Sequence, residues 1–367
     1  MKVGIIVPGG MDPGGTERVI PVLLALIERL AAVHEIHVFA LAPARRSSVY
    51  PLRGATVHAM GSGARSARAA AAITRVHRQG PFDVLHAFWA VPCGSIAALA
   101  GRTLGVPVIT HIAGGELIAL PDIAYGGRRT SRGRAAVLAA LGGARCITAA
   151  SRPILDEARG LGFRAERLPL GVDTRTWPPV PPRPRDSSRP ARLIAVGSLN
   201  GVKDPRTLLE STRILADDGV DFMLDVVGED TLDGAPLRWA RELDVEDRVR
   251  FHGFLPQQRL RPLVEGADVL LHAARHEAGP VVLLEAAVAG VPAVGTRVGH
   301  FAEWAPAAAA AVDPGNARSL ADAARILLDD DAQRMSITRA AQARALAEDA
   351  DFTAQRVLDL YHTMVRG

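Results

Sequence analysis

The sequence is poor in several kinds of residue that mark well-known classes of protein. Only two of its 367 residues are cysteines, Cys93 and Cys146, and both stand among apolar residues. We therefore expect buried free thiols, and neither a disulfide framework nor a cysteine metal site. Aromatic residues make up 4% of the chain, and no stretch alternates them with basic residues as in single-strand binders, which argues against nucleic acid as a partner.

Long hydrophobic runs are also absent. The longest weakly polar run, from His86 to Gly101, is interrupted by Pro92 and falls short of the ~20 residues that span a bilayer. The apolar run before Pro8 is too short for a signal peptide, so we expect a cytoplasmic protein. A basic helix at Ala64–Gln79 and a basic, glycine-rich loop at Tyr125–Arg134 leave peripheral contact with the inner face of the membrane open, although a charged helical stripe is more often a solvated face.

Strands and helices alternate along most of the chain. A strand at Val3–Val7 is followed by a glycine-rich loop and a helical pattern from Val19 to Leu30, which is the first half of a nucleotide-binding α/β unit. A second such unit begins with a strand at Leu193–Val196. This alternation predicts parallel sheets with right-handed crossovers, and the chain is long enough for two domains.

The composition changes most abruptly at a proline-rich stretch. Trp177–Pro190 reads WPPVPPRPRDSSRP, which cannot form a regular element and indicates a stiff linker. We therefore place one α/β domain at 1–173, a linker at 174–190, and a second α/β domain at 191–349.

Two glutamates, Glu277 and Glu285, organise the second domain. Glu277 follows a predicted strand at Asp268–His272. Gly279-Pro280 then make a turn, and a helix that carries Glu285 is expected to begin near Val281. This geometry aims both carboxylates at one crevice, where a helix N-terminus favours a phosphate and carboxylates suit sugar hydroxyls. The alternative is that both are ordinary loop and helix-surface acids.

The block around these glutamates resembles the E-x7-E signature of retaining glycosyltransferases with the GT-B fold, in particular glycosyltransferase family 4. The shared residues are Glu277, Gly279-Pro280, Leu284-Glu285-Ala286 and Gly290-x-Pro292, whereas Ala273-Ala274 replace a common Pro-Ser pair. The resemblance implies an α/β fold of two doubly wound Rossmann-like domains that face each other across a cleft. It also implies that a terminal helix at 350–367 packs back on the first domain.

The resemblance further assigns residues of both domains to a nucleotide-sugar donor. They are Gly14, Gly15, Ser198, Lys203, Gly253, Phe254, Glu277, Ala278, Gly279, Pro280, Val281, Val282 and Glu285. Lys203 suits a phosphate oxygen as a point charge, whereas Ser198 stands where the family commonly has arginine and brings no charge. Gly14-Gly15 either let the backbone approach an anion closely or only make a tight turn.

Three residues are candidates for catalysis: Glu277, Lys203 and His111. The family often has a histidine followed by glycine near the transferred sugar. If Gly114-Gly115-Glu116 sets the register, that position falls on Ala113, and His111 lies on the same side of the strand. The alternative is a strand-end histidine bonded to a neighbouring carbonyl.

The reaction that the resemblance implies moves a sugar from a UDP- or GDP-sugar to a hydroxyl of a glycan, glycolipid or small molecule, with retention at the anomeric carbon, as in cell-envelope or exopolysaccharide biosynthesis. No nucleophile with a paired base is evident, so a covalent intermediate is not favoured. The resemblance implies a front-face displacement, in which the leaving phosphate helps to deprotonate the acceptor. No metal or other cofactor is required, and Asp329–Asp331 lie between two helical patterns, which is unsuitable for a metal site. A sugar-nucleotide epimerase and a non-catalytic nucleotide-sugar-binding protein remain alternatives, whereas the missing G-x-G-x-x-G disfavours a nicotinamide oxidoreductase.

Overall fold

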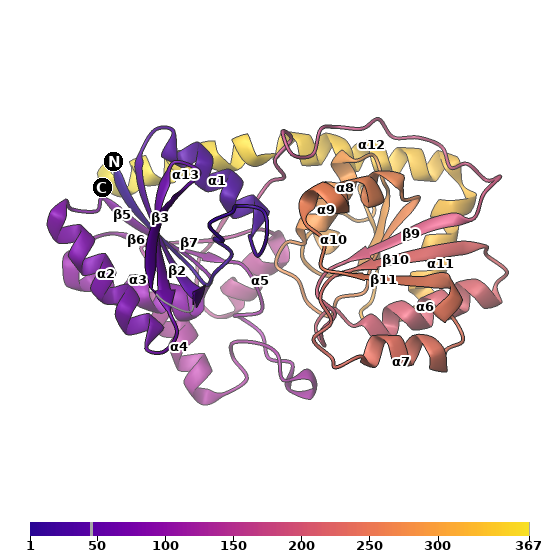
Figure 1. The fold of residues 1–367 in the computed structure, drawn as a ribbon, viewed down its shortest axis with the longest axis horizontal. Helices are drawn as coiled ribbons and strands as arrows, with labels where there is room; N and C mark the ends of the chain where they lie inside the picture. The colour runs from indigo at the N-terminus through magenta and orange to yellow at the C-terminus, as the bar shows by residue number, and fades with distance from the viewer. Residues whose placement is uncertain (45–46, 367) are drawn as a thin grey trace. The chain divides into compact units, whose positions relative to one another are not determined.

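The computed structural model describes residues 1–44 and 47–366. The chain divides into two compact units, drawn in Figure 1. The first unit contains Met1–Asp173 and the C-terminal segment from Ala350, and the second contains Thr174–Asp349. None of the helices in the described part is long and apolar enough to cross a membrane.

The first unit is built on an eight-stranded sheet in the order β3-β4-β2-β1-β5-β6-β7-β8. Its strands are β1 (Lys2–Val7), β2 (Glu35–Ala44), β3 (Ser48–Leu52), β4 (Ala55–Gly61), β5 (Val84–Phe88), β6 (Val108–Ile112), β7 (Cys146–Ala149) and β8 (Glu166–Arg167). Its helices are α1 (Pro21–Ala31), α2 (Arg65–Gln79), α3 (Ser95–Leu104), α4 (Ser131–Gly142), α5 (Arg152–Gly160) and α13 (Ala350–Arg366). All neighbouring strands are parallel except β3 and β4, which are antiparallel.

The second unit is built on a six-stranded parallel sheet in the order β11-β10-β9-β12-β13-β14. Its strands are β9 (Ala191–Val196), β10 (Phe222–Val227), β11 (Val249–Gly253), β12 (Val269–His272), β13 (Ala293–Thr296) and β14 (Ala310–Val312). Its helices are α6 (Pro205–Asp217), α7 (Ala235–Glu242), α8 (Gln257–Gly266), α9 (Val281–Val288), α10 (Gly299–Trp304), α11 (Ala317–Asp329) and α12 (Asp331–Ala347). The predicted pair of parallel-sheet, Rossmann-like units is confirmed.

Both sheets reverse their strand order at an internal point. In the first unit the chain moves outward from β1 to β2 and then returns to β5 on the other side of β1. In the second unit β9 and β12 have the same relation. Loops that follow the two central strands diverge at such a point, which is where open α/β sheets bind ligands.

The C-terminal helix α13 belongs to the core of the first unit. It lies beside α1 (Figure 1). Its apolar face, which includes Val357 and Leu360, packs in one cluster with Leu23 and Ile27 of α1. Tyr361 is fully buried, and its hydroxyl lies 3.0 Å from Nδ1 of His86 on β5. The last helix of the chain therefore completes a domain whose other elements end at residue 173.

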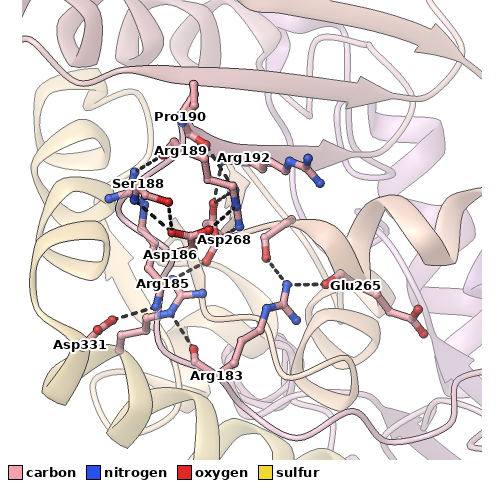
Figure 2. Close-up of polar contacts among 12 residues, drawn as sticks. Arg183, Arg185, Asp186, Ser188, Arg189, Pro190, Arg192, Glu265, Asp268 and Asp331 are labelled. Carbon is pink, nitrogen blue, oxygen red and sulfur yellow. Dashed lines mark hydrogen bonds and ion pairs between the residues drawn. The ribbon is translucent and has the colours of Figure 1, made fainter.

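The proline-rich stretch is held against the second unit over much of its length. The Val180 N–H donates to the carbonyl of Val288 at 3.0 Å. The guanidinium of Arg183 donates to the carbonyl of Glu265 at 2.6 Å, and that of Arg189 donates two hydrogen bonds to the carboxylate of Asp268 at 2.9 Å each (Figure 2). The segment that we expected to be a linker is thus fixed to one unit by its arginines.

The basic segment at Tyr125–Arg134 differs from the loop that we expected. Helix α4 begins inside it at Ser131. Thr130 is the N-cap residue, because its hydroxyl accepts a hydrogen bond from the Gly133 N–H at 3.0 Å. The glycines and arginines of this segment are typical of a loop, so we did not predict the helix that Thr130 caps.

Candidate functional site

Two loops leave neighbouring strands at the point where the strand order of the second unit reverses. One follows β9 and carries Lys203, and the other follows β12 and carries Glu277. The ammonium group of Lys203 forms an ion pair with the carboxylate of Glu277. The backbone also joins the loops, since the Arg275 N–H donates to the carbonyl of Val202 at 2.7 Å. The fold therefore brings together two of the residues that the sequence singled out.

Glu277 is charged despite being largely enclosed. Its side chain is 15% exposed, and His272 Nε2 lies 3.3 Å from its Oε1. Burial alone would raise the pKa of Glu277, but the charge of Lys203 and the contact with His272 lower that pKa to about 2. His272 is buried at the end of β12, and burial lowers its pKa, so it faces Glu277 as a neutral ring.

A glycine at the start of α10 supports the loop of Glu277. Gly299 has φ +49°, and a Cβ there would lie 2.8 Å from the carbonyl oxygen of Glu277. The backbone of this loop can rest on α10 only because position 299 has no side chain. Helix α9 then begins at Val281, as predicted, with Pro280 as its N-cap residue. The Leu283 N–H donates to the carbonyl of Pro280 at 3.2 Å, whereas the N–H groups of Val281 and Val282 have no acceptor within the helix and can face an anion.

Glu285 occupies a different environment. It lies in the second turn of α9, is 4% exposed, and accepts a hydrogen bond from the side-chain amide of Gln257 on α8 at 3.0 Å. Gln257 in turn accepts from the indole N–H of Trp177 at 2.7 Å. Burial raises the pKa of Glu285 to about 7, against the opposing effect of the Gln257 hydrogen bond. No hydrogen bond or ion pair of the described residues joins Glu285 to Glu277.

The loops after β9, β10 and β11 lie in close backbone contact. A Cβ on Gly228, after β10, would lie 1.9 Å from the carbonyl oxygen of Gly197, after β9. The Gly228 N–H donates to the carbonyl of Gly253 at 2.9 Å. Ser198 is exposed beside Gly197, and Phe254 follows Gly253 with 55% of its surface exposed. These predicted donor residues therefore lie together at the carboxyl ends of β9, β10 and β11.

The predicted turn at Gly14-Gly15 in the first unit does not lie at the start of a helix. The Gly15 N–H donates to the Asp12 carbonyl at 2.9 Å, and the Gly14 N–H donates to the Asp12 carboxylate at 3.1 Å. Gly15 has φ +67°, which glycine adopts readily. Residues 16–20 separate this turn from α1, which begins at Pro21. Its N–H groups are therefore those of a tight turn and not of a helix N-terminus.

His111 is a core residue. It lies on β6, has no exposed surface, and places Nδ1 2.9 Å from the hydroxyl of Thr148 on β7. Burial lowers the pKa of His111 to about 3, so the ring is neutral. The structure gives it a hydroxyl as its partner, where the alternative interpretation expected a carbonyl.

A third acid, Glu116, is a positioning residue that sequence reasoning missed. Its carboxylate accepts hydrogen bonds from the N–H groups of Ala90, Ala113 and Gly114 at 3.2, 3.1 and 2.6 Å. Burial raises the pKa of Glu116, and these N–H groups act against that effect. The contact ties the segment after β5 to the loop after β6. The only sequence signal was its place in the Gly114-Gly115-Glu116 motif.

Comparison with known proteins accounts for most of the chain. Residues 13–176 match the family described as Glycosyltransferase Family 4, and residues 182–344 match Glycosyl transferases group 1. The chain belongs to the group 1 glycosyltransferases of family 4. A glycogen synthase of Mycobacterium tuberculosis is 31% identical to this family member over 201 residues, which are 54% of this chain and 48% of that protein. The chain spans about half the length of the curated relatives that it matches first.

Solved structures of glycosyltransferases share the fold over nearly the whole chain. A sucrose-phosphate synthase of Thermosynechococcus elongatus has a TM-score of 0.83 at 18% identity, with 99% of each chain covered. The HepE protein of Anabaena, solved in complex with UDP-glucose, has a TM-score of 0.77 at 17% identity and covers 99% of this chain and 100% of its own. At these identities the likeness shows the fold, and the predicted GT-B fold is confirmed.

Proposed function

We propose that the protein is a retaining glycosyltransferase that moves a sugar from a UDP- or GDP-sugar to an acceptor hydroxyl. The observation that carries this proposal is the Lys203–Glu277 ion pair at the switch point of the second sheet. Family membership supports the reaction class, and the UDP-glucose complex of HepE supports the donor class. The acceptor is a hydroxyl of a glycan, a glycolipid or a small molecule.

The ion pair indicates how the site would bind a nucleotide-sugar donor. A diphosphate that approaches Lys203 takes over its charge and releases Glu277 from the pair. The released carboxylate of Glu277 can then accept hydrogen bonds from sugar hydroxyls, which replace the contact that Lys203 made with it. Ser198 and the residues Ala278, Gly279, Pro280, Val281 and Val282 at the start of α9 would surround the diphosphate.

The neighbouring loops would bind the nucleoside end of the donor. The backbone of Gly253 and Phe254 would hold the base, and Glu285 would bind the ribose or nearby groups. His111 has no exposed surface and its ring contacts Thr148 of β7, so we assign it no contact with the reacting atoms.

The chemical step is a front-face displacement. The bond between the anomeric carbon and the diphosphate oxygen breaks, and the bond to the acceptor oxygen forms on the same face of the sugar. The acceptor proton passes to an oxygen of the departing diphosphate, so no protein nucleophile and no metal takes part. Lys203 and the amide groups of α9 stabilise the charge that develops on the leaving group.

Product stereochemistry tests this proposal. UDP- and GDP-sugars would be incubated with the protein and a panel of hydroxyl acceptors, and the products analysed by proton NMR. We expect transfer from at least one donor with the anomeric configuration retained, and loss of transfer in Lys203→Ala. An inverted product would overturn the mechanism, and interconversion of the donor sugar without an acceptor would identify an epimerase instead.

A further inference from the structure

The second unit contains a groove away from the carboxyl ends of its strands. The groove has a volume of about 430 Å³ and lies on the face of the sheet formed by β9, β10 and β11, beside α8. Its charged lining comes from Arg189, Arg192, Asp225, Arg250 and His252. Neither Lys203 nor Glu277 lines it, so the groove is separate from the proposed donor site.

The strand register explains why these side chains share one face. Asp225 of β10 pairs with Arg250 of β11, and Arg192 of β9 pairs with Met223. Alternate residues of a strand point to the same side, so Met223 and Asp225 share a face. The register shifts beside His252, but its ring reaches the same face, because its Nε2 lies 2.7 Å from Oδ1 of Asp225. The intervening residues, such as Leu224, are buried on the opposite face. One side of these three strands is therefore a core face and the other is a polar groove.

Two of the arginines in the groove have no charged partner. Arg189 is held by Asp268, and Asp225 lies 2.7 Å from His252. The guanidinium groups of Arg192 and Arg250 make no hydrogen bond or ion pair with any residue in the described ranges 1–44 and 47–366. Figure 2 shows the side chain of Arg192 extending away from the cluster around Asp268, and only the backbone N–H of Arg192 donates to the carboxylate of Asp268, at 2.8 Å.

Protection of a sheet edge accounts for only one of these charges. β11 is an edge strand, and a charged residue such as Arg250 hinders pairing with another chain. Arg192 lies on β9, two strands in from that edge, where this reason does not apply. Its side chain lines the same groove as that of Arg250, so two guanidinium groups without a charged partner line one hollow. Two such groups suit a dianion.

We propose that this groove binds a small, soluble phosphate monoester that carries hydroxyl groups. Arg192 and Arg250 would hold the phosphate, and the carboxylate of Asp225 would accept a hydrogen bond from a hydroxyl. Leu263 and Pro262 of α8 supply an apolar wall for a short carbon skeleton. The volume lies within the range of small-molecule sites, and a hollow with a carboxylate in it suits a soluble ligand better than a flat anionic membrane.

Calorimetric titration with glycerol 3-phosphate tests the proposal. The variants are Arg192→Gln/Arg250→Gln and, as a control with the same change of charge, Arg238→Gln/Arg241→Gln on α7, which does not line the groove. We expect saturable binding by the wild type and the control, and binding at least about ten-fold weaker in the groove variant, because charge-assisted hydrogen bonds are lost. No saturable binding by the wild type, or equal binding by the groove variant, would overturn the proposal.

A second comparison tests the part assigned to Asp225. Asp225→Ala removes the hydroxyl acceptor and also a negative charge, so it should lower the affinity for glycerol 3-phosphate relative to that for inorganic phosphate. An unchanged ratio of the two affinities contradicts the hydroxyl contact. Both experiments report on binding in the groove alone, so their outcome does not depend on sugar transfer.

Discussion

Glu277 and Glu285 belong to one sequence motif, yet their charges differ because their neighbours differ. Glu277 has the ammonium of Lys203 beside it, which keeps its pKa at about 2. Glu285 has only the neutral amide of Gln257, and burial raises its pKa to about 7. At neutral pH one is a fixed anion and the other is close to half protonated, which suits one to sugar hydroxyls and makes the other sensitive to pH.

Substitution of Glu277 separates its chemical role from its charge. Glu277→Gln keeps the shape of the side chain but removes the anion, so we expect sugar transfer to fall about 100-fold or more. The initial rate of nucleotide release in the presence of acceptor measures this effect. Glu210→Gln, an exposed residue paired with Arg206, is the control and should retain the wild-type rate. Near-normal turnover in Glu277→Gln would remove Glu277 from the mechanism.

Glu285 makes the stability of the second unit depend on pH. The folded protein holds the Glu285 proton up to about pH 7, whereas the unfolded chain releases it near the ordinary value of 4.5. The folded state binds more protons between these values, so the free energy of unfolding falls by roughly 3 kcal/mol as pH rises through this window.

Urea unfolding at pH 5 and pH 8 measures this dependence. We expect Glu285→Gln to lose most of it, because the amide resembles the protonated acid and does not titrate. If the free energy of unfolding changed equally between pH 5 and pH 8 in the wild type and in Glu285→Gln, the assignment would be contradicted.

At the level of elements, local patterns predicted much of the chain. The strands predicted at Val3–Val7 and Leu193–Val196 lie within β1 and β9, and the start of α9 at Val281 followed from its glycine-proline turn. Strand β3 was not predicted, because Pro51 disfavours a strand in most positions of a sheet. An edge strand such as β3 tolerates proline. Helices α6 and α7 were not assigned, although each has a proline in its first turn.

The sequence predicted only those parts of the candidate site that follow from the order of strands and loops. Lys203 and Glu277 were expected at the ends of strands, and the sheet order places their loops side by side. The bond between Gln257 and Glu285 and the N–H contacts of Glu116 join residues from separate segments. No spacing along a single sequence indicates such contacts.

The anchoring of the proline-rich segment depends on one buried acid. Asp268 is 1% exposed and accepts two hydrogen bonds from Arg189, so Asp268→Asn removes the charge that fixes the segment. We expect the free energy of unfolding of the second unit to fall by about 2 kcal/mol, because the pair is only partly buried. Limited proteolysis within 177–190 should accelerate as well. Asp217→Asn, an exposed residue of α6 that pairs with Arg213 outside this segment, is the control and should change neither quantity comparably.

At the scale of the whole molecule, each unit has its own sheet and core, but the first unit is not continuous in sequence. The chain leaves it at Asp173, forms the second unit, and returns at Ala350. The apolar face of α13 is part of the first core, with Tyr361 fully buried beneath it. The stability of the first unit should therefore depend on residues more than 180 positions away from its other elements.

Tyr361→Ala tests this dependence. Truncating a buried aromatic side chain should destabilise the first unit by about 4 kcal/mol, and the hydrogen bond to His86 is lost with it. Hydrogen exchange followed by mass spectrometry should show faster exchange in β1 and β5 and unchanged exchange in β9 and β12. Equal acceleration in both units, or none in the first, would show that α13 is not part of the first core.

An equilibrium titration of UDP and GDP tests most directly whether the loop of Lys203 receives a nucleotide diphosphate. The wild type, Lys203→Gln, and the exposed control Arg213→Gln would be titrated at the same ionic strength. We expect saturable binding of at least one nucleotide by the wild type and the control, and binding at least about ten-fold weaker in Lys203→Gln. Equal affinity in Lys203→Gln and the wild type, or no binding by the wild type, would contradict this expectation.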